Sequence, residues 1–333
     1  MSPAVNLTAA HIAPGAMSGA DPVRSAPALH LRLPATSANL GPGFDTLALA
    51  LTLGLEIEAK RLPAGATESI LTATGRNPEV CSSTRRNLLL DVYQKTLAAH
   101  GAEHLPLALA IRNEIPIGMG FGSSAAVRLA GLALANHFGK LGWDRDQILT
   151  EASRLEGHPD NVAACWLGGF TVATTDAGRV HAVSIPAPPS WRVLLVTPEQ
   201  PLATASARMV LPRAYDQDDV VFNIQRASLM IAAFATGRGD LLRVAMQDRM
   251  HQPFRGEICP LLPQLLPLAG TSSILGVALS GAGPSVLLLV EEASAINDIR
   301  AVVTAWIDST MPVELIECGI ESSPAVVEII AAK

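Results

Sequence analysis

The stretch Ile115-Pro-Ile-Gly-Met-Gly-Phe-Gly-Ser-Ser-Ala-Ala126 decides the fold of this 333-residue chain. It follows an expected strand and leads into an Ala/Leu-rich helix. Its three alternating glycines let the backbone take conformations closed to other residues and approach a ligand closely. Ser123 and Ser124 then begin a helix whose free amide groups and positive dipole end favour an anion. A triphosphate suits such a loop, although a glycine-rich turn with a serine cap would explain it too.

Two better-known phosphate loops do not fit this stretch. A P-loop ends in Gly-Lys-Ser/Thr, whereas Gly122 is followed directly by Ser123 with no lysine. A dinucleotide fingerprint reads Gly-x-Gly-x-x-Gly, and here Gly118-x-Gly120 is followed by Ser123 in the last glycine position. The loop therefore belongs to a different class of anion-binding device.

Outward from the loop, strands and helices mix without regular β-α-β alternation, which favours an α+β fold in two lobes. Asp144 is expected to cap a helix, with Gln147 completing a capping box. A loop is expected over 34–45 because of its composition. The expected strands are 29–33, 47–57, 107–112, 170–174, 192–197, 275–280, 285–290, 313–318 and 325–330, and the expected helices are 88–99, 144–155, 219–236, 240–250 and 292–308.

The Pro-rich passage Ile185-Pro-Ala-Pro-Pro-Ser190 is the best candidate for a domain boundary. It divides the chain into an N-terminal domain over 29–188 and a C-terminal domain over 189–333. Residues 1–28 are rich in Ala, Pro, Ser and Gly, and we expect them to form a loose tail.

Composition excludes several classes of protein. A net charge of -6 argues against a nucleic-acid binder, which usually carries a basic patch. No long unbroken apolar run predicts a membrane span, and the start of the chain lacks the pattern of a secretory signal. We therefore expect a cytoplasmic protein that binds neither membrane nor nucleic acid. Its four cysteines lie far apart and are expected to be reduced, namely Cys81, Cys165, Cys259 and Cys318.

Three motifs in a fixed order carry a resemblance to a known family. They are Pro34-Ala-Thr-Ser-Ala-Asn-Leu-Gly-Pro-Gly-Phe-Asp45, the loop over 115–126, and Leu279-Ser-Gly-Ala-Gly-Pro-Ser285. Between the last two lies Glu156-Gly-His-Pro-Asp-Asn161. Together they cover about 30–330, and the chain resembles the superfamily of galactokinases, homoserine kinases, mevalonate kinases and phosphomevalonate kinases (GHMP kinases).

The residues within the motifs are most similar to those of the homoserine kinase branch. The Ala-Asn-Leu-Gly-Pro-Gly-Phe-Asp form of the first motif resembles it, as do Thr204-Ala-Ser-Ala-Arg-Met-Val-Leu-Pro212 and His251-Gln-Pro-Phe-Arg255. Two departures are Phe121 in place of the usual leucine and Ala48 where glycine often follows. Both are apolar or small and put little in doubt.

The resemblance implies a two-lobed fold and an activity. The N-terminal domain would resemble domain 2 of ribosomal protein S5, and the C-terminal domain would be ferredoxin-like. The implied reaction is ATP-dependent phosphorylation of the side-chain hydroxyl of L-homoserine, in threonine biosynthesis, by a magnesium-dependent homodimer. The residues that the resemblance implies for nucleotide binding are Pro116, Ile117, Gly118, Met119, Gly120, Phe121, Gly122, Ser123, Ser124, Ala125 and Ala126.

Magnesium needs about six oxygens and keeps several waters, so one or two protein ligands suffice. By resemblance these are Ser124 and Glu156. Glu151, on the same expected helix, is the rival ligand, and Glu156 could also be a solvated carboxylate at a helix end.

The resemblance also implies an amino-acid site. A substrate carboxylate calls for arginine forks, which Arg208 and Arg255 match, although each could be a surface side chain. A substrate ammonium calls for a carboxylate, which Asp45 matches. Asn39 and Asn161 match polar contacts near the amino-acid backbone or hydroxyl, and Asn39 could instead stabilise its loop through an Asx turn.

The catalytic base is left open. His158, in a His-Pro loop, is more typical of a structural residue. Asp160 occupies the position of the base proposed in the mevalonate kinase branch, whereas homoserine kinases are thought to work without one. Other kinases of the superfamily, acting on mevalonate, a sugar or shikimate, are the alternative function, and a non-catalytic ligand sensor is a second.

Overall fold

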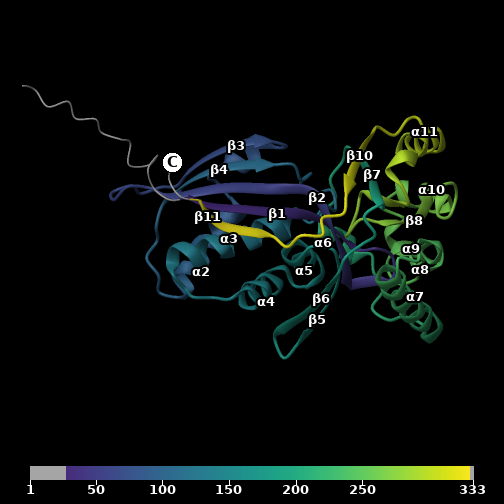
Figure 1. Cartoon of the computed structure of the whole chain (residues 1–333), viewed down its shortest axis with the longest axis horizontal. Coiled ribbons are helices and arrows are strands. Elements are labelled where there is room, and N and C mark those ends of the chain that lie inside the picture. Colours follow the sequence, from purple (N-terminus) through teal and green to yellow (C-terminus); the bar gives the residue numbers. More distant parts are fainter. Residues whose placement is uncertain (1–27, 331–333) are drawn as a thin grey trace, which may run out of the picture.

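The computed structural model describes residues 28–330, apart from the side chains of residues 204 and 205. The described residues form two lobes placed end to end (Figure 1). The first lobe contains a seven-stranded sheet with the order β11-β1-β2-β4-β3, in which β5 pairs with β2 and β6. Its strands are β1 (Ala28–Asn39), β2 (Gly43–Arg61), β3 (Ile70–Gly75), β4 (Leu107–Asn113), β5 (Phe170–Asp176), β6 (Arg179–Ile185) and β11 (Val326–Ile330).

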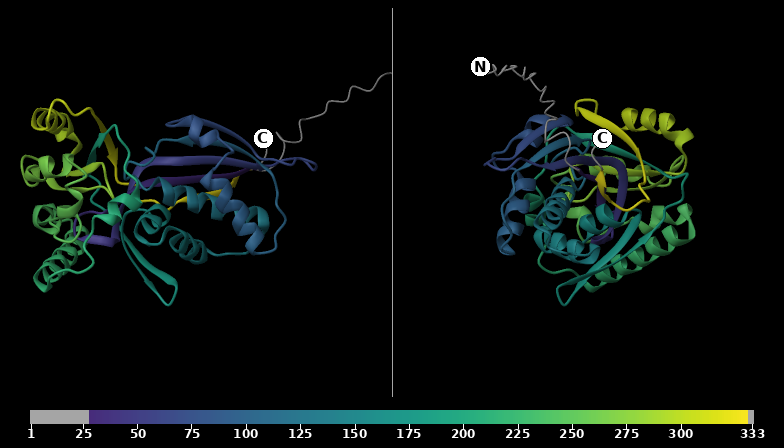
Figure 2. Two further views of the ribbon diagram at one scale, coloured as in Figure 1. Left: turned by 180° about the vertical axis from the view of Figure 1, so that it is seen from behind. Right: turned by 60° about the vertical axis from the view of Figure 1, so that its left-hand side comes forward.

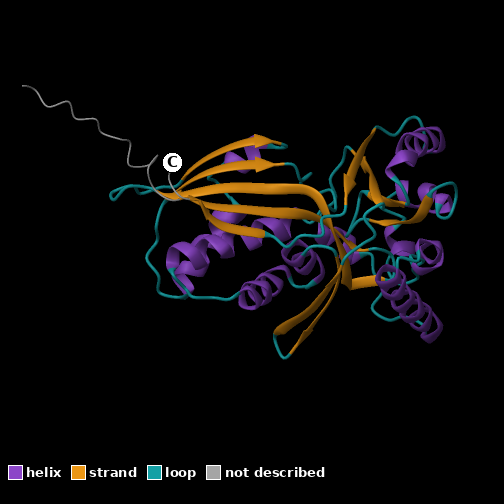
Figure 3. Ribbon diagram, in the orientation of Figure 1, coloured by secondary structure: helices purple, strands orange, loops and turns teal. Residues whose placement is uncertain are grey.

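Helices cover one face of this sheet, as Figure 3 and the view from behind in Figure 2 show. The predicted capping box of Asp144 and Gln147 is confirmed at the start of α4. The Asn87 side chain caps α2 by accepting hydrogen bonds from two backbone amides. The helices are α1 (Pro78–Ser82), α2 (Leu88–Ala99), α3 (Ser123–Gly139), α4 (Arg145–Glu156) and α5 (Asp160–Leu167).

The second lobe contains a four-stranded antiparallel sheet with the order β10-β7-β9-β8. Its chain order of strand, helices, two strands, helix and strand is that of a ferredoxin-like fold, as the resemblance implied. The strands are β7 (Arg192–Pro198), β8 (Ile274–Leu279), β9 (Val286–Val290) and β10 (Val313–Gly319). The helices are α6 (Thr204–Met209), α7 (Gln217–Thr236), α8 (Leu242–Ala245), α9 (Gln252–Arg255), α10 (Leu261–Leu265) and α11 (Ile296–Trp306), with 3-10 turns η1 (Gly239–Leu241), η2 (Leu266–Leu268) and η3 (Ala293–Ala295).

The loop expected over 34–45 is largely a strand, so that prediction was wrong. β1 continues to Asn39 and β2 begins at Gly43, with only a short turn between them. Thr36 and Ser37 made this segment look like a loop, but both are fully buried within the sheet. Their hydroxyls bond to Asn161 and Ser280, so tertiary partners satisfy groups that composition alone assigns to solvent.

The helix expected over 240–250 is also interrupted. Regular helix ends at Ala245, and the Asp248 side chain accepts hydrogen bonds from the backbone amides of Met250, His251 and Gln252. A side chain that takes up backbone donors in this way competes with continued helix. The result is a turn that leads into α9.

The expected domain boundary separates the two sheets, because β6 ends at Ile185 and β7 begins at Arg192. The strand at 325–330 departs from the predicted division. It was assigned to the C-terminal domain, yet β11 pairs antiparallel with β1 in the first sheet. The tail expected over 1–28 lies outside the described residues, except for Ala28, which begins β1. None of the described helices is long and apolar enough to cross a membrane.

Candidate functional site

Three motifs from distant parts of the sequence meet between the two lobes. The Thr36 amide donates to the Phe121 carbonyl at 3.0 Å, which joins the first motif to the glycine-rich loop. The Gly281 amide donates to the Ala38 carbonyl at 3.0 Å, which joins the first motif to the third. The Ser280 hydroxyl donates to the Gly120 carbonyl at 2.7 Å and closes the triangle. The three motifs therefore form one hydrogen-bonded unit.

The glycine-rich loop requires glycine for both conformation and space. Gly120 and Gly122 have φ angles of +83° and +67°. A Cβ on Gly120 would overlap the Ser280 carbonyl oxygen, and one on Gly122 would overlap the Thr36 hydroxyl. Helix α3 begins at Ser123, so its first amide groups lack helical partners and stand at the end of the loop. This geometry fits an anionic phosphate group.

Only part of the predicted loop lines the central cleft. The loop residues that border the cleft are Gly118, Gly120, Phe121, Gly122, Ser123 and Ser124. Ala125 and Ala126 are fully buried in the core of the first lobe, and Pro116, Ile117 and Met119 do not border this cleft.

The two predicted metal ligands are in direct contact. The Ser124 hydroxyl donates to Oε2 of Glu156 at 2.9 Å, and both residues border the cleft. A hydroxyl and a carboxylate side by side are the hard oxygen donors that magnesium prefers. Glu151 instead pairs with Arg154 and lies outside the cleft, which makes Glu156 the better candidate.

Opposite charges face each other on the other side of the cleft. Nη2 of Arg208 donates to the Asp45 carboxylate at 2.6 Å. The guanidinium groups of Arg208 and Arg255 lie 5.5 and 5.4 Å from the centre of the Phe44 ring. The first motif and helices α6 and α9 thus bring a carboxylate and two cations together.

Arg255 is 1% exposed and is held by carbonyl oxygens. Its Nε donates to the Ala207 carbonyl at 3.1 Å and its Nη1 to the Gly281 carbonyl at 3.3 Å. Burial lowers the pKa of Arg255, and the nearby positive charge of Arg208 lowers it further. Two close cations with a single carboxylate between them form a site that favours an added anion.

His251 lies beneath Arg255 as a neutral partner. The His251 side chain is fully buried, and burial lowers its pKa. Its Nε2 lies 2.7 Å from the Gly41 carbonyl oxygen, and its Nδ1 lies 3.3 Å from Nη1 of Arg255. Nε2 therefore donates to the carbonyl, while Nδ1 is free to accept from the guanidinium.

The Asn39 amide already has partners on both sides. Its Nδ2 donates to the Gly281 carbonyl at 2.7 Å, and its Oδ1 accepts from the Asp45 amide at 3.0 Å. Asn39 also has a positive φ of +69°. These bonds agree with the loop-stabilising alternative, and a substrate contact by Asn39 stays a prediction.

Asn161, His158 and Asp160 form a compact group beside Glu156. The Thr36 hydroxyl donates to Oδ1 of Asn161 at 2.6 Å and fixes the orientation of this amide. Nδ1 of His158 lies 2.6 Å from Oδ1 of Asp160. Burial alone would lower the pKa of His158, but the Asp160 carboxylate raises it overall. His158 and Asp160 are therefore engaged with each other.

We expect Asp160→Asn to leave kcat within about tenfold of the wild type, whereas loss of a general base costs about 10²–10⁴. Asp160 is 1% exposed, and its Oδ1 is occupied by His158 and by the backbone amide of Asn161. The asparagine keeps an acceptor oxygen for these bonds. Steady-state rates with circular dichroism as a folding control test this. A thousandfold loss of kcat in a folded variant with unchanged KM values would make Asp160 the base.

Several site residues had escaped the sequence analysis. Thr36 and Ser280 lie inside quoted motifs, but nothing local indicates that their hydroxyls join two loops. Arg128 contacts Glu156 from one turn further along α3 than Ser124, a spacing that could have identified it. Leu202 lines the cleft from a segment with no sequence signal.

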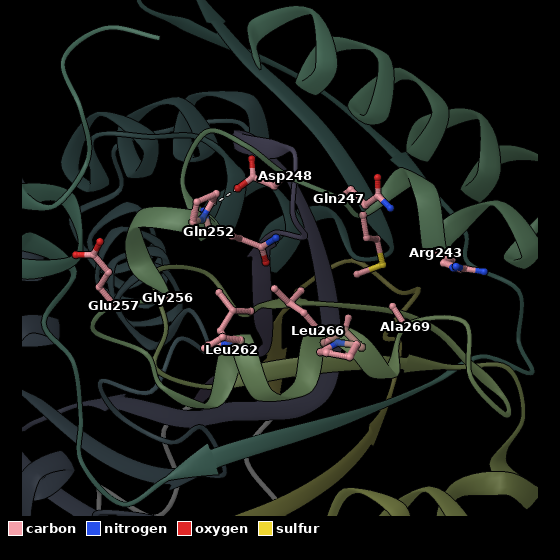
Figure 4. A pocket seen from close by; sticks show the side chains of 14 residues that line it. Arg243, Gln247, Asp248, Gln252, Gly256, Glu257, Leu262, Leu266 and Ala269 are labelled. Atoms are coloured by element: carbon pink, nitrogen blue, oxygen red, sulfur yellow. Dashed lines mark hydrogen bonds between the residues drawn. The ribbon is translucent and has the colours of Figure 1, made fainter. Parts of the chain in front are cut away.

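A wider cleft lies in the second lobe, with a volume of about 680 Å³ (Figure 4). It contains none of the predicted site residues. Gln252 and Leu262 point into it, and Arg243 and Glu257 lie at its edge. The chemistry-bearing side chains are gathered in the smaller cleft between the motifs, which is the candidate active site.

Comparison with known proteins agrees with this geometry. The family models for the GHMP kinases N terminal domain and the GHMP kinases C terminal match residues 87–169 and 230–308. A homoserine kinase of Solibacter usitatus is 47% identical over 79% of this chain and 85% of its own length. One from Synechocystis is 36% identical over 85% of this chain and 92% of its own. The crystal structure of homoserine kinase from Cytophaga hutchinsonii has the same fold, with a TM-score of 0.76 at 22% identity, over 90% of this chain and 97% of that one. The chain belongs to the homoserine kinase family of the GHMP kinases.

Proposed function

We propose that this protein transfers the γ-phosphate of ATP to the side-chain hydroxyl of L-homoserine, a step of threonine biosynthesis, with magnesium as cofactor. The observation that carries the proposal is the Arg208–Asp45 pair at 2.6 Å, which lines the same cleft as Ser124 and Glu156. An amino-acid recognition pair and a phosphate site therefore border one space.

The substrate chemistry matches this pair. Homoserine carries a carboxylate and an ammonium on one carbon. Its carboxylate can pair with Arg208 and its ammonium with Asp45. Arg255 adds a second guanidinium whose pKa is lowered by burial and by its neighbour, and which gains from an anion. A sugar lacks both charges and mevalonate lacks the ammonium. Asp45 is thus the residue that favours an amino acid over these alternatives.

The phosphate side matches a nucleotide. The start of α3 and the left-handed glycines before it form a cradle that a Cβ at Gly120 or Gly122 would fill. Ser124 and Glu156 are the oxygen donors for a magnesium ion. Bound magnesium would neutralise charge on the phosphates. Phosphoryl transfer then depends mainly on positioning and on electrostatic stabilisation.

The acceptor hydroxyl needs orientation more than deprotonation. In a loose transition state the nucleophile keeps its proton until late, so a phosphate oxygen can accept it. Asn161, fixed by Thr36, is placed to orient the hydroxyl. Asp160 is engaged with His158 and is not required as a base.

Substrate choice tests the proposal. In a coupled assay of ADP release, L-homoserine should show kcat/KM at least about tenfold above mevalonate, shikimate or galactose, because each alternative lacks at least one of the two charges. The activity should disappear with EDTA and return with magnesium. Equal or better turnover of mevalonate or a sugar would contradict the assignment, and no ADP release with any alcohol would favour a ligand sensor.

A further inference from the structure

We propose that Arg128 is a phosphate-binding residue that exchanges partners. It pairs with Glu156 when no divalent cation is bound, and with the triphosphate when a divalent cation occupies Glu156. This inference deepens the proposed use of ATP and magnesium and rests on it. It assigns a role to a side chain that neither the motifs nor the glycine-rich loop identifies.

The contact that motivates the proposal is shared by three residues. Nε of Arg128 donates to Oε2 of Glu156 at 2.5 Å, the same oxygen that accepts from the Ser124 hydroxyl at 2.9 Å. The side chains of Arg128 and Glu156 are 23% and 12% exposed. Oε2 of Glu156, which contacts the other proposed metal ligand Ser124, is therefore already paired with the positively charged Arg128 guanidinium.

The geometry of α3 places Arg128 within reach of the phosphate loop. Arg128 follows Ser124 by four residues, so both lie on one face of the helix. Side chains on a helix lean toward its N-terminus, which here is the end of the glycine-rich loop. The guanidinium thus projects back toward the point where α3 offers its free amide groups.

The charge of the cleft explains why a cation is needed there. The loop over 115–126 contains no lysine or arginine, unlike a P-loop. Among the described residues that line the cleft, the arginines are Arg208 and Arg255, and both lie beside Phe44 at the amino-acid end. No cationic side chain of the described cleft lining would otherwise face a triphosphate at this end. Arg128 is the nearby side chain that can supply a permanent positive charge.

Competition for Glu156 gives the exchange its direction. A divalent cation and a guanidinium on the same carboxylate repel each other, so each weakens the binding of the other. A cation on Glu156 therefore weakens the Arg128–Glu156 pair, and the oxygens of a bound triphosphate are strong acceptors for the released guanidinium. Removing the Arg128 charge should consequently weaken nucleotide binding and strengthen cation binding. A structural role would not produce effects of opposite sign.

The test measures these two affinities separately in Arg128→Met. Equilibrium dialysis of ATP at saturating magnesium, without homoserine, should show a Kd about tenfold higher than in the wild type, since the bond between Arg128 and the phosphates forms once a cation occupies Glu156 and is lost in the variant. Electron paramagnetic resonance with Mn²⁺, at saturating ADP, should show a several-fold lower Kd for the cation. Arg128→Lys should restore much of the ATP affinity. Arg154→Met, which breaks an exposed ion pair on α4 outside the cleft, should change neither affinity.

The outcomes separate this inference from the function beneath it. If wild-type protein binds ATP but Arg128→Met leaves both affinities unchanged, or weakens both, the partner exchange is wrong while the kinase assignment stands. Thermal unfolding of Arg128→Met and Arg128→Lys shows whether a loss of both affinities comes from misfolding. If Arg128→Met is misfolded, the test is the folded Arg128→Lys variant, and a loss of its ATP affinity as large as that expected for Arg128→Met would contradict the proposal. A wild type that binds no ATP would overturn the proposed function together with this inference.

Discussion

Glu156→Gln should lower kcat by about 10²–10³. The substitution keeps the size and one acceptor oxygen but removes the negative charge that a magnesium ion requires, and metal stabilisation of transferring phosphates is worth several kcal/mol, about tenfold in rate for every 1.36 kcal/mol. The Ser124 hydroxyl bond to this side chain can persist in the glutamine variant. Initial rates across a range of magnesium concentrations are the measurement, and part of the loss should be recovered at high magnesium.

Glu151→Gln is the matched control for this experiment. It is the same chemical change on the same helix α4, but Glu151 pairs with Arg154 at the surface and does not line the cleft. Exposed pairs of this kind contribute little, so kcat should stay close to wild type. A larger loss in Glu151→Gln than in Glu156→Gln would show that the metal carboxylate is the other residue.

Arg255→Ala should reduce kcat/KM for homoserine by a hundredfold or more while the KM for ATP changes far less. A hydrogen bond to a charged group is worth about 1.5–3 kcal/mol, or roughly ten- to hundredfold. The loss at Arg255 should exceed this value because the side chain is buried, so truncation also removes the guanidinium donor of the Ala207 carbonyl. Kinetics with each substrate varied in turn separate the two effects.

Arg208→Ala serves as a graded comparison for the second prediction. Its side chain is 40% exposed, and it donates a hydrogen bond to Asp45. Its loss should cost about tenfold, less than that of Arg255. If either variant damages ATP binding more than homoserine use, these arginines serve phosphates and the substrate carboxylate is bound elsewhere.

The parts of the fold that sequence predicts well are those decided by nearby residues. The capping box of Asp144 and Gln147 and the period-2 pattern of β1 are local, and both are confirmed. The interrupted helix after Ala245 depends on Asp248 taking up backbone amides, which periodicity does not detect. Likewise Thr36 and Ser37 become strand residues only because Asn161 and Ser280 satisfy their hydroxyls.

The candidate site follows the same rule. Motif resemblance identifies Ser124, Glu156 and the two arginines as members of the site, but not how they are paired. The Arg208 contact with Asp45 joins residues 163 positions apart, and the contact of Arg128 with Glu156 joins residues 28 apart. The first pairing depends on the meeting of the two lobes and the second on the packing of α3 against α4, so both require the three-dimensional structure.

Because β11 belongs to the first sheet, that sheet can be completed only after the chain of the second lobe has been synthesised. Ala28 pairs with Ile330, so the outer edge of β1 stays unpaired until some three hundred further residues have been synthesised. During synthesis the first lobe presents an unpaired strand edge, and such edges are sites of association with other chains. Closing so long a loop carries an entropic cost that local contacts cannot offset early. The nascent protein can therefore complete its first sheet only after all strands of the ferredoxin-like lobe have been synthesised, and we expect the two lobes to unfold as one cooperative unit.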